Sequence, residues 1–312
     1  MPLVSIGLPV YNGENFLDEA IYSILAQTCK DFELIISDNA STDGTPEICR
    51  AYAAQDARIR YYRQASNRGA IANFNFVFER AAGRYFKWAA HDDVIAPTFL
   101  ECCVQVLEHR PESVLCFPAI SYINEQCLVQ KTVSCDLSIR AQTPVDRLKA
   151  FVNHQLDRND IFWAVFGLMR SEALRRAGPL GKYVASDQVL LVKLLLLGQF
   201  HQHPESLYAR RVHPLASTVR LPKLRMYRER AAWYDAGTTA RLVLPNWRLL
   251  LEIFSAIRDD RLLQRGKVGC YYPIAKMFFR RWKRLARELM FIPTQILEHG
   301  YKWQPPRHFS TH

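Results

Sequence analysis

Apolar and amphipathic segments alternate along the first 110 residues of the chain. Short apolar runs predict strands at residues 4–10, 32–37, 59–62 and 85–89. Segments with one apolar helical face predict helices at residues 15–27, 45–54, 71–82 and 98–109. A strand followed by a helix, repeated four times, predicts an α/β fold with a Rossmann-like, mostly parallel sheet covered by helices. In such sheets, ligands bind beyond the carboxyl ends of the strands.

The pattern weakens after residue 110. Further strands are predicted at residues 114–122 and 162–170, with mixed strand and loop at residues 124–144. Helices are predicted at residues 145–155, 171–177 and 189–197. The most apolar stretch, residues 189–198, is too short to cross a bilayer and contains Lys193, so we interpret it as a buried helix. Residues 220–312 are predicted to form helices interrupted by Pro222, Pro245, Pro273 and Pro293.

Four polar clusters follow the first four predicted strands. They are Pro9-Val10-Tyr11-Asn12-Gly13, the run from Ser37 to Gly44, Asn67-Arg68-Gly69 and His91-Asp92-Asp93. Asn, Asp, Ser and Gly also form turns and helix caps, so each cluster taken alone has a purely local explanation. Four such clusters at one edge of a sheet favour a ligand-binding site.

Asp92 and Asp93 carry the clearest chemical signal. Two adjacent carboxylates repel each other, and this cost is usually tolerated where a cation or a hydrogen-bonded ligand is present. Oxygen ligands suit Mg²⁺ or Mn²⁺, and proteins often share such ions with substrate phosphates. The pair therefore predicts a nucleotide diphosphate site. The sequence contains neither Gly-x-Gly-x-x-Gly nor Gly-x-x-x-x-Gly-Lys-Ser/Thr, which counts against a dinucleotide oxidoreductase and a P-loop NTPase.

In their order and spacing, these four clusters resemble the motifs of family 2 glycosyltransferases, and the resemblance covers roughly residues 1–215. It implies a GT-A fold, a nucleotide-sugar donor and a divalent metal, Mg²⁺ or Mn²⁺. It also implies hexosyl transfer with inversion at the anomeric carbon. A UDP-sugar is favoured because it is the commonest donor within the family.

The resemblance assigns donor-binding roles to residues that follow the first three strands. Pro9, Tyr11 and Asn12 match the first turn that contacts the nucleotide. Asp38 matches the residue that recognises the base, and Arg68 is placed to reach a phosphate. The alternative for Arg68 is an ordinary solvated loop arginine.

The resemblance also assigns the metal site. Asp92 matches the carboxylate near the ribose and the metal, and Asp93 the principal metal ligand on the diphosphate. Many relatives have a further acid at the position of Ala90, and its absence implies modest metal affinity. His213 lies in a segment that matches one returning to the active site in the family, where it would contact the metal or the diphosphate. Its alternative role is a structural hydrogen bond. Arg210 or Arg211, close by, is a candidate to neutralise leaving-group charge; the alternative is that both are only solvated.

Asp187 matches the general base of the family, at the start of the apolar helix. An inverting displacement needs a carboxylate to take the proton of the acceptor hydroxyl. A helix N-terminus keeps such a carboxylate ionised. The structural alternative is that Ser186 or Asp187 only caps the helix.

Composition adds information on class and compartment. The 312 residues are 49% hydrophobic and 23% charged, which is typical of a folded globular protein with one large domain or two smaller ones. The eight cysteines form no Cys-x-x-Cys pair, which favours reduced thiols in a cytoplasmic protein. The N-terminus has no secretion signal pattern.

The net charge of +11 is concentrated at the C-terminal end. Residues 220–312 contain 19 Lys and Arg against 7 Asp and Glu, while residues 1–219 contain 22 against 23. We therefore predict a GT-A domain at residues 1–219 and a basic helical extension at residues 220–312. Within the domain, residues 1–110 form the nucleotide-binding half and residues 111–219 the acceptor half.

The extension mixes bulky apolar and cationic side chains between residues 271 and 292. This pattern favours an amphipathic helix on an anionic membrane surface, with the enzyme peripheral at the inner face of the plasma membrane. At that membrane surface the enzyme would encounter a glycan or lipid-linked acceptor. The alternative is a helical lid or a dimer contact with a solvated charged face.

Two other classes of function remain as alternatives. One is a non-catalytic protein that binds nucleotides or nucleic acid, suggested by the basic extension. The chain lacks zinc-finger spacing and an RNP1-type motif, so specific nucleic-acid recognition is not expected. The other is a nucleotidyltransferase, but the glycine-rich loop typical of that class is missing after the first strand.

Overall fold

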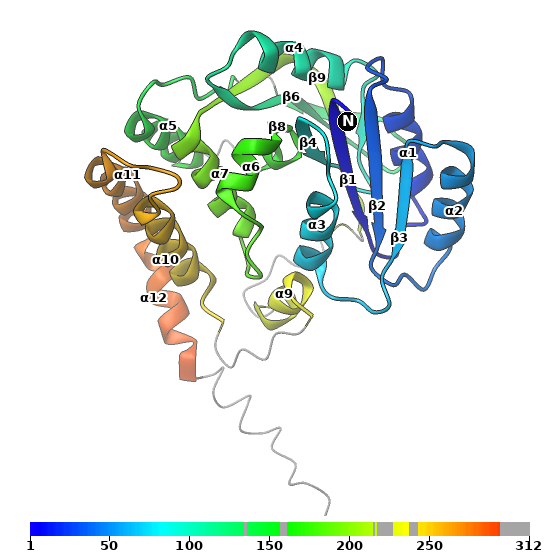
Figure 1. The fold of residues 1–312 in the computed structure, drawn as a ribbon. Coiled ribbons are helices and arrows are strands. Elements are labelled where there is room, and N and C mark those ends of the chain that lie inside the picture. Colours follow the sequence, from blue (N-terminus) through cyan, green and yellow to red (C-terminus); the bar gives the residue numbers. More distant parts are fainter. Residues whose placement is uncertain (134–135, 157–160, 215, 217–226, 237–242, 294–312) are drawn as a thin grey trace, which may run out of the picture.

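A curled, nine-stranded sheet forms the centre of the computed structural model (Figure 1). The structure describes residues 1–133, 136–156, 161–214, 216, 227–236 and 243–293. The strands are β1 (Val4–Val10), β2 (Phe32–Asp38), β3 (Ile59–Arg63), β4 (Tyr85–Trp88), β5 (Val94–Ile95), β6 (Ser113–Ile123), β7 (Val129–Val133), β8 (Leu168–Arg170) and β9 (Gln199–Arg211). Their order is β3-β2-β1-β4-β8-β6-β9-β5, with β7 beside β6.

Most of the strands run in one direction. β1 is parallel to β2 and β4, and β2 is parallel to β3. β8 is antiparallel to both β4 and β6, so β6 and its parallel neighbour β9 have the direction of β1. The carboxyl ends of β1, β2, β3, β4, β6 and β9 therefore face the same side of the molecule. This arrangement confirms the predicted α/β fold with a mostly parallel sheet.

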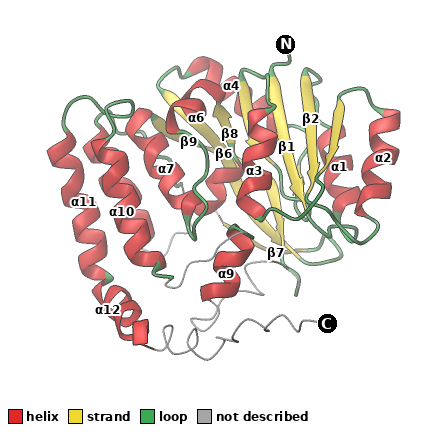
Figure 2. Ribbon diagram, turned by 60° about the horizontal axis from the view of Figure 1, so that its bottom comes forward, coloured by secondary structure: helices red, strands yellow, loops and turns green. Residues whose placement is uncertain are grey.

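Helices cover both faces of the sheet. They are α1 (Leu17–Leu25), α2 (Thr45–Gln55), α3 (Ala70–Glu79), α4 (Phe99–His109), α5 (Pro144–Leu156), the 3-10 helix η1 (Phe162–Phe166), α6 (Ser171–Ala177), α7 (Ser186–Leu197), α9 (Tyr227–Tyr234), α10 (Pro245–Arg258), α11 (Lys267–Arg280) and α12 (Trp282–Met290). Figure 2 shows α3 on one face of the sheet, with α1 on the other. Every residue of β1 is buried, as expected for a parallel strand covered on both faces.

The structure corrects two expectations. The predicted strand at residues 162–170 is a 3-10 helix over Phe162–Phe166, and only Leu168–Arg170 joins the sheet. A short apolar run buried on all sides has no periodicity that separates a strand from a helix. Pro273, predicted to interrupt a helix, lies inside α11, where it is buried together with Ile274. Tertiary packing thus outweighs the helix-breaking preference of proline.

The C-terminal helices pack against the body of the protein. α10 contacts α7, α11 contacts α5, and α12 contacts α10. Ile253 of α10 and Ile274 of α11 belong to the same buried core as the sheet. The predicted domain boundary at residue 219 lies outside the described residues. Among the helices that the structure describes, none combines the length and apolar character needed to cross a membrane.

Lys87 in β4 is fully buried. Its ammonium group donates to the backbone oxygen of Trp88 at 3.0 Å and lies 4.7 Å from the centre of the Phe99 ring. Removal from water lowers the pKa of Lys87 to about 8. Because the pKa in the unfolded chain is higher, about 10.4, the charged lysine reduces stability near neutral pH. This penalty disappears as the pH rises from about 8 to about 10.4.

We therefore expect Lys87→Met to raise the free energy of unfolding by about 2–3 kcal/mol near pH 7. The difference from the wild type should shrink as the pH approaches about 10, because the unfolded wild-type chain then loses the same proton. Urea denaturation at several pH values measures this. Lys30→Met, at an exposed position, is the control. A stability difference that does not change with pH would show that the burial of charge is not its cause.

Candidate active site

Hydrogen bonds join the loops that follow β1 and β2. The backbone N–H of Asn12 donates to Ser41 Oγ at 2.9 Å, and Asn12 Oδ1 accepts the N–H of Thr42 at 2.9 Å. The N–H of Gly13 donates to Thr45 Oγ1, also at 2.9 Å. Asn12 has a φ of 51°, a left-handed conformation that Asn tolerates better than most residues. The first two predicted clusters are therefore neighbours.

Asp38 lies beneath these loops and is fully buried at the end of β2. Its Oδ1 accepts the N–H of Ser41 at 2.8 Å, and its Oδ2 accepts the hydroxyl of Tyr61 at 3.0 Å. Arg63 Nε is 3.6 Å from the same Oδ2. The carboxylate thus shapes the loop after β2. Pro9 is buried within β1, whereas Tyr11 is exposed at the surface of the β1 loop.

Two asparagines that sequence reasoning missed connect the third loop to the first two. Asn39 Nδ2 donates to Asn67 Oδ1 at 2.9 Å, and its Oδ1 accepts the N–H of Arg68 at 3.0 Å. Asn73 of α3 donates to the backbone oxygen of Ser37 at 2.8 Å. Asn39 stands inside the second polar cluster and could have been found there. Asn73 lies within an amphipathic helix, where no local signal marks it. The side chain of Arg68 is exposed.

Asp92 and His213 face each other although 121 residues separate them in the chain. His213 Nε2 lies 3.0 Å from Asp92 Oδ2, and the imidazole packs edge-on against Phe16 with ring centres 4.7 Å apart. Burial alone would raise the pKa of Asp92. The hydrogen bond with His213, followed by the charges of His91 and His213, outweighs that effect and leaves the pKa below its ordinary value. The pair therefore favours an ionised carboxylate beside an imidazole.

Asp93 points to different partners. Its Oδ1 accepts the backbone N–H of Arg211 at 2.8 Å, and its Oδ2 accepts the hydroxyl of Tyr208. Only 8% of the residue is exposed. Burial, followed by the negative charge of Asp92, raises the pKa of Asp93 to about 7. The two adjacent acids thus have separate surroundings: Asp92 faces His213, while both oxygens of Asp93 are engaged with β9.

Arg211 holds this corner of the site together. Its fully buried guanidinium donates to the backbone oxygen of Asp92 at 3.0 Å and to that of Glu125 at 2.8 Å. It also pairs with Glu19 of α1 and lies 4.5 Å from the centre of the Phe16 ring. One side chain therefore connects the Asp92 loop, the turn between β6 and β7, and α1. Its donors are directed at protein groups, an arrangement that fixes these three segments relative to one another.

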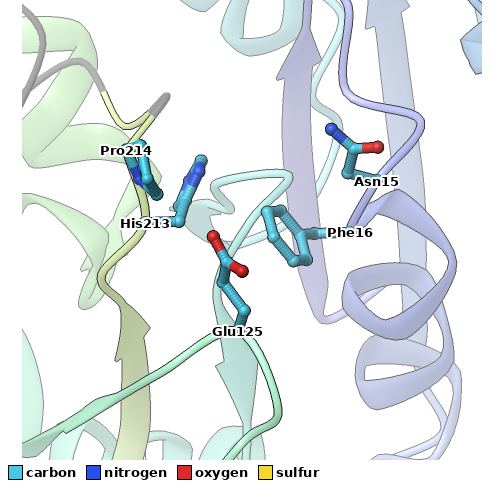
Figure 3. A pocket seen from close by; sticks show the side chains of 5 residues that line it. All are labelled: Asn15, Phe16, Glu125, His213 and Pro214. Atoms are coloured by element: carbon cyan, nitrogen blue, oxygen red, sulfur yellow. The ribbon is translucent and has the colours of Figure 1, made fainter.

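A pocket of about 420 Å³ adjoins the Asp92–His213 pair. It is lined by Asn15, Phe16, Glu125, His213 and Pro214. Figure 3 shows the His213 imidazole, the Phe16 ring and the Glu125 carboxylate at its rim, supplied by segments far apart in the chain. The pocket places aromatic and carboxylate groups next to the paired Asp92.

Asp187 lies in the first turn of α7. α7 leads through Gly198 directly into β9, so the helix runs against that strand and begins on the side where the parallel strands end (Figure 1). Ala185, just before the helix, has a left-handed φ of 68°. The free N–H groups of a helix start favour a nearby negative charge. Because α7 begins where the parallel strands end, Asp187 lies at the same edge of the sheet as Asp92.

The residues present fit a divalent cation that a substrate helps to bind. Asp92 Oδ2 and His213 Nε2 lie 3.0 Å apart, so a carboxylate oxygen and an imidazole nitrogen are present side by side. Within the described part of the chain, no group of three or more His, Cys, Asp or Glu residues is arranged to hold a metal. Mg²⁺ is commonly held by one or two carboxylates plus substrate phosphates, so the Asp92 carboxylate would be one ligand of such an ion.

The chain belongs to glycosyl transferase family 2, whose model matches residues 5–183. An uncharacterized glycosyltransferase of Rickettsia typhi is 40% identical over 106 residues, which cover 34% of this chain and 32% of that protein. Glycosyltransferase GlyG of Streptococcus pneumoniae is 33% identical over 113 residues, covering 36% of this chain and 38% of that protein. The matches span about a third of the length of these relatives.

Solved structures share the fold over nearly the whole chain. S. aureus TarS 1-349, in complex with UDP-GlcNAc, has a TM-score of 0.66 at 14% identity and covers 94% of this chain and 81% of that one. Mannosyltransferase PcManGT from Pyrobaculum calidifontis, in complex with GDP-Man and Mn²⁺, has a TM-score of 0.54 at 18% identity, with 98% and 77% covered. The fold is that of the GT-A glycosyltransferases, as the sequence predicted.

Proposed function

We propose that the protein is a metal-dependent, inverting hexosyltransferase. It moves a sugar from a nucleoside diphosphate donor, with a UDP-sugar favoured, to a hydroxyl group of a glycan or lipid-linked acceptor. The observation that carries this proposal is the Asp92–His213 pair beside a pocket at the strand ends of a family 2 chain. An ionised carboxylate and an imidazole at that place suit a cation that is shared with phosphate oxygens.

The donor is proposed to lie over the loops that follow β1, β2 and β3. Asp38, which the resemblance matches to the residue that recognises the base, is fully buried and is proposed to shape the base site through the loop after β2. Pro9, Tyr11 and Asn12 form the turn against which the nucleotide packs. The exposed Arg68 pairs with a phosphate. Three observations support these roles. Asn12 is joined to the β2 loop, Asp38 lies directly beneath that loop, and Asn39 holds the backbone of Arg68 beside it.

Asp92 and His213 are proposed to hold Mg²⁺ or Mn²⁺, with the remaining ligands supplied by the donor diphosphate. A bound divalent cation stabilises negative charge on the departing diphosphate. Asp93, predicted from the sequence as the principal ligand, is proposed instead to support the site, because it is 8% exposed and each of its oxygens accepts a hydrogen bond from β9, one from Tyr208 and one from Arg211. Arg211 then keeps the Asp92 loop in place through its bond to the backbone oxygen of Asp92.

Asp187 is proposed as the general base. It takes the proton of the acceptor hydroxyl as that oxygen attacks the anomeric carbon, on the face opposite the leaving diphosphate. This direction of attack inverts the configuration. The place of Asp187 in the first turn of α7 supports the role, because the free N–H groups of a helix start favour a nearby negative charge.

The acceptor and the cellular setting follow from the same proposal. Transfer to a glycan or lipid-linked acceptor places the enzyme in the synthesis of cell-envelope polysaccharides. We place it in the cytoplasm, peripheral at the inner face of the plasma membrane. The basic, aromatic C-terminal helices support this placement.

A panel of UDP-, GDP- and dTDP-sugars tests the proposed activity. We expect one nucleotide to raise the melting temperature in the presence of Mn²⁺, and its sugar conjugate to be hydrolysed slowly to the nucleoside diphosphate. EDTA should abolish both effects. A nucleotidyltransferase would instead release pyrophosphate from a nucleoside triphosphate. If a nucleotide raised the melting temperature of the protein but no donor released its sugar with any metal, the chain would be a binding protein and the proposal would be contradicted.

A further inference from the structure

The outward face of α11 and the start of α12 carry a stripe of exposed apolar side chains. Val268, Tyr272, Phe279 and Trp282 are 84%, 67%, 78% and 56% exposed. Their spacing places them along one side of the helix, while Ile274 and other apolar residues of the opposite side are buried in the core. A cluster of large, exposed apolar side chains on one surface often marks an interaction site.

Most of the charges around this stripe are positive. Exposed cations flank it, namely Lys276, Arg280, Lys283, Arg284 and Arg287. The one acid between residues 267 and 293 is Glu288, which is fully buried. Both of its carboxylate oxygens accept the N–H of Asn246 at 3.0 Å, at the start of α10. That acid is therefore used inside the fold. Asp260, just before α11, is exposed but pairs with Lys267, and the cations from Lys276 to Arg287 have no acidic residue exposed among them on α11 and α12.

The same helices stand at the outer edge of the molecule. In Figures 1 and 2, α11 is the outermost helix of the layer formed by α10 and α11, away from the sheet. α12 continues from it toward the side on which β1, β2 and β3 end (Figure 1). A flat surface can therefore approach the stripe without meeting the central sheet.

We propose that the outward face of α11 and α12 docks on an anionic phospholipid bilayer. Apolar and aromatic side chains insert at the boundary between head groups and acyl chains, and the flanking cations pair with lipid phosphates. A second copy of the chain fits less well, because a two-fold contact through this face would bring like charges together. Nucleic acid would account for the cations but leaves the exposed Val268 and Phe279 without a role. This proposal refines the location given above and does not depend on sugar transfer.

Vesicle co-sedimentation of the full chain tests the proposal. Vesicles contain phosphatidylcholine alone or mixed with phosphatidylglycerol. We expect binding to the mixed vesicles that weakens with salt, and at least about a tenfold loss of affinity for the double variant Lys276→Glu with Arg280→Glu. A second variant, Phe279→Ser with Trp282→Ser, should lose affinity to a similar extent.

Matched controls separate the surface from general effects. Lys30→Glu with Arg110→Glu makes the same change of charge at exposed positions elsewhere. Tyr22→Ser with Leu128→Ser removes two other exposed apolar side chains. Both controls should bind as the wild type does, and the melting temperature of every variant verifies folding. Asp92→Asn should also bind normally, so the result is independent of catalysis.

Three results would overturn the proposal. The first is equal recovery with and without phosphatidylglycerol. The second is a loss of affinity in the controls as large as in the test variants. The third is a dimer, detected by sedimentation, that Phe279→Ser with Trp282→Ser dissociates while vesicle binding is absent, since the face would then be a contact between copies.

Discussion

Asp187→Asn is expected to lower turnover by at least about a hundredfold while leaving donor binding unchanged. Asparagine has the size of aspartate but cannot take a proton from the acceptor hydroxyl. The first turn of α7 can accommodate either side chain, so the fold should be unaffected. The measurement is kcat at saturating donor and acceptor, together with calorimetric titration of the nucleotide diphosphate.

Glu172→Gln is a matched control, because Glu172 is an exposed acid in the first turn of the preceding helix, α6. It should retain the turnover of the wild type. A turnover near the wild-type value in Asp187→Asn would remove Asp187 as the base. A parallel loss of folding stability and turnover would point to a structural role for Asp187 instead.

Asp92→Asn is expected to reduce turnover by at least about a hundredfold, whereas Asp93→Asn should have a much smaller effect. Asp92 supplies the charged oxygen that faces His213. An amide at position 93 can still accept the N–H of Arg211 and donate to Tyr208, so the local structure persists without the carboxylate. Turnover across a range of Mn²⁺ concentrations distinguishes the two variants.

His213→Gln extends this comparison, since it removes the imidazole opposite Asp92. It should raise the Mn²⁺ concentration required for half-maximal turnover. The reverse order, a severe loss in Asp93→Asn and near-normal turnover in Asp92→Asn, would restore Asp93 as the principal ligand predicted from the sequence.

The sequence predicted the strand–helix units of the first 110 residues well, because hydrophobic periodicity directly reflects which face of an element is buried. It was less informative for residues 162–166, where full burial removes the periodicity. The long strand β9 was not predicted either. Its polar stretch around Glu205 lies where the register with β6 shifts, and irregular pairing of that kind leaves no alternating pattern.

The site was predictable in part. Four clusters after four strands predicted that these residues gather at one edge of the sheet, since parallel strands end together, and the structure joins the first three there by hydrogen bonds. The partners of Asp93 were not predictable, because they depend on the antiparallel pairing of β5 with β9, in which Val94 faces Ala209 and Ile95 faces Tyr208. No spacing in the sequence encodes that register. The same register buries the guanidinium of Arg211, which in the sequence alone resembles an ordinary basic residue.

The central claim is that Asp92 and His213 hold a cation together with a nucleoside diphosphate. Calorimetric titration of the cognate diphosphate, with Mn²⁺ and with EDTA, tests it most directly. The account predicts that Mn²⁺ tightens binding by at least about tenfold in the wild type and in Asp93→Asn, but not in Asp92→Asn. Equal tightening by Mn²⁺ in the wild type and in Asp92→Asn would contradict it.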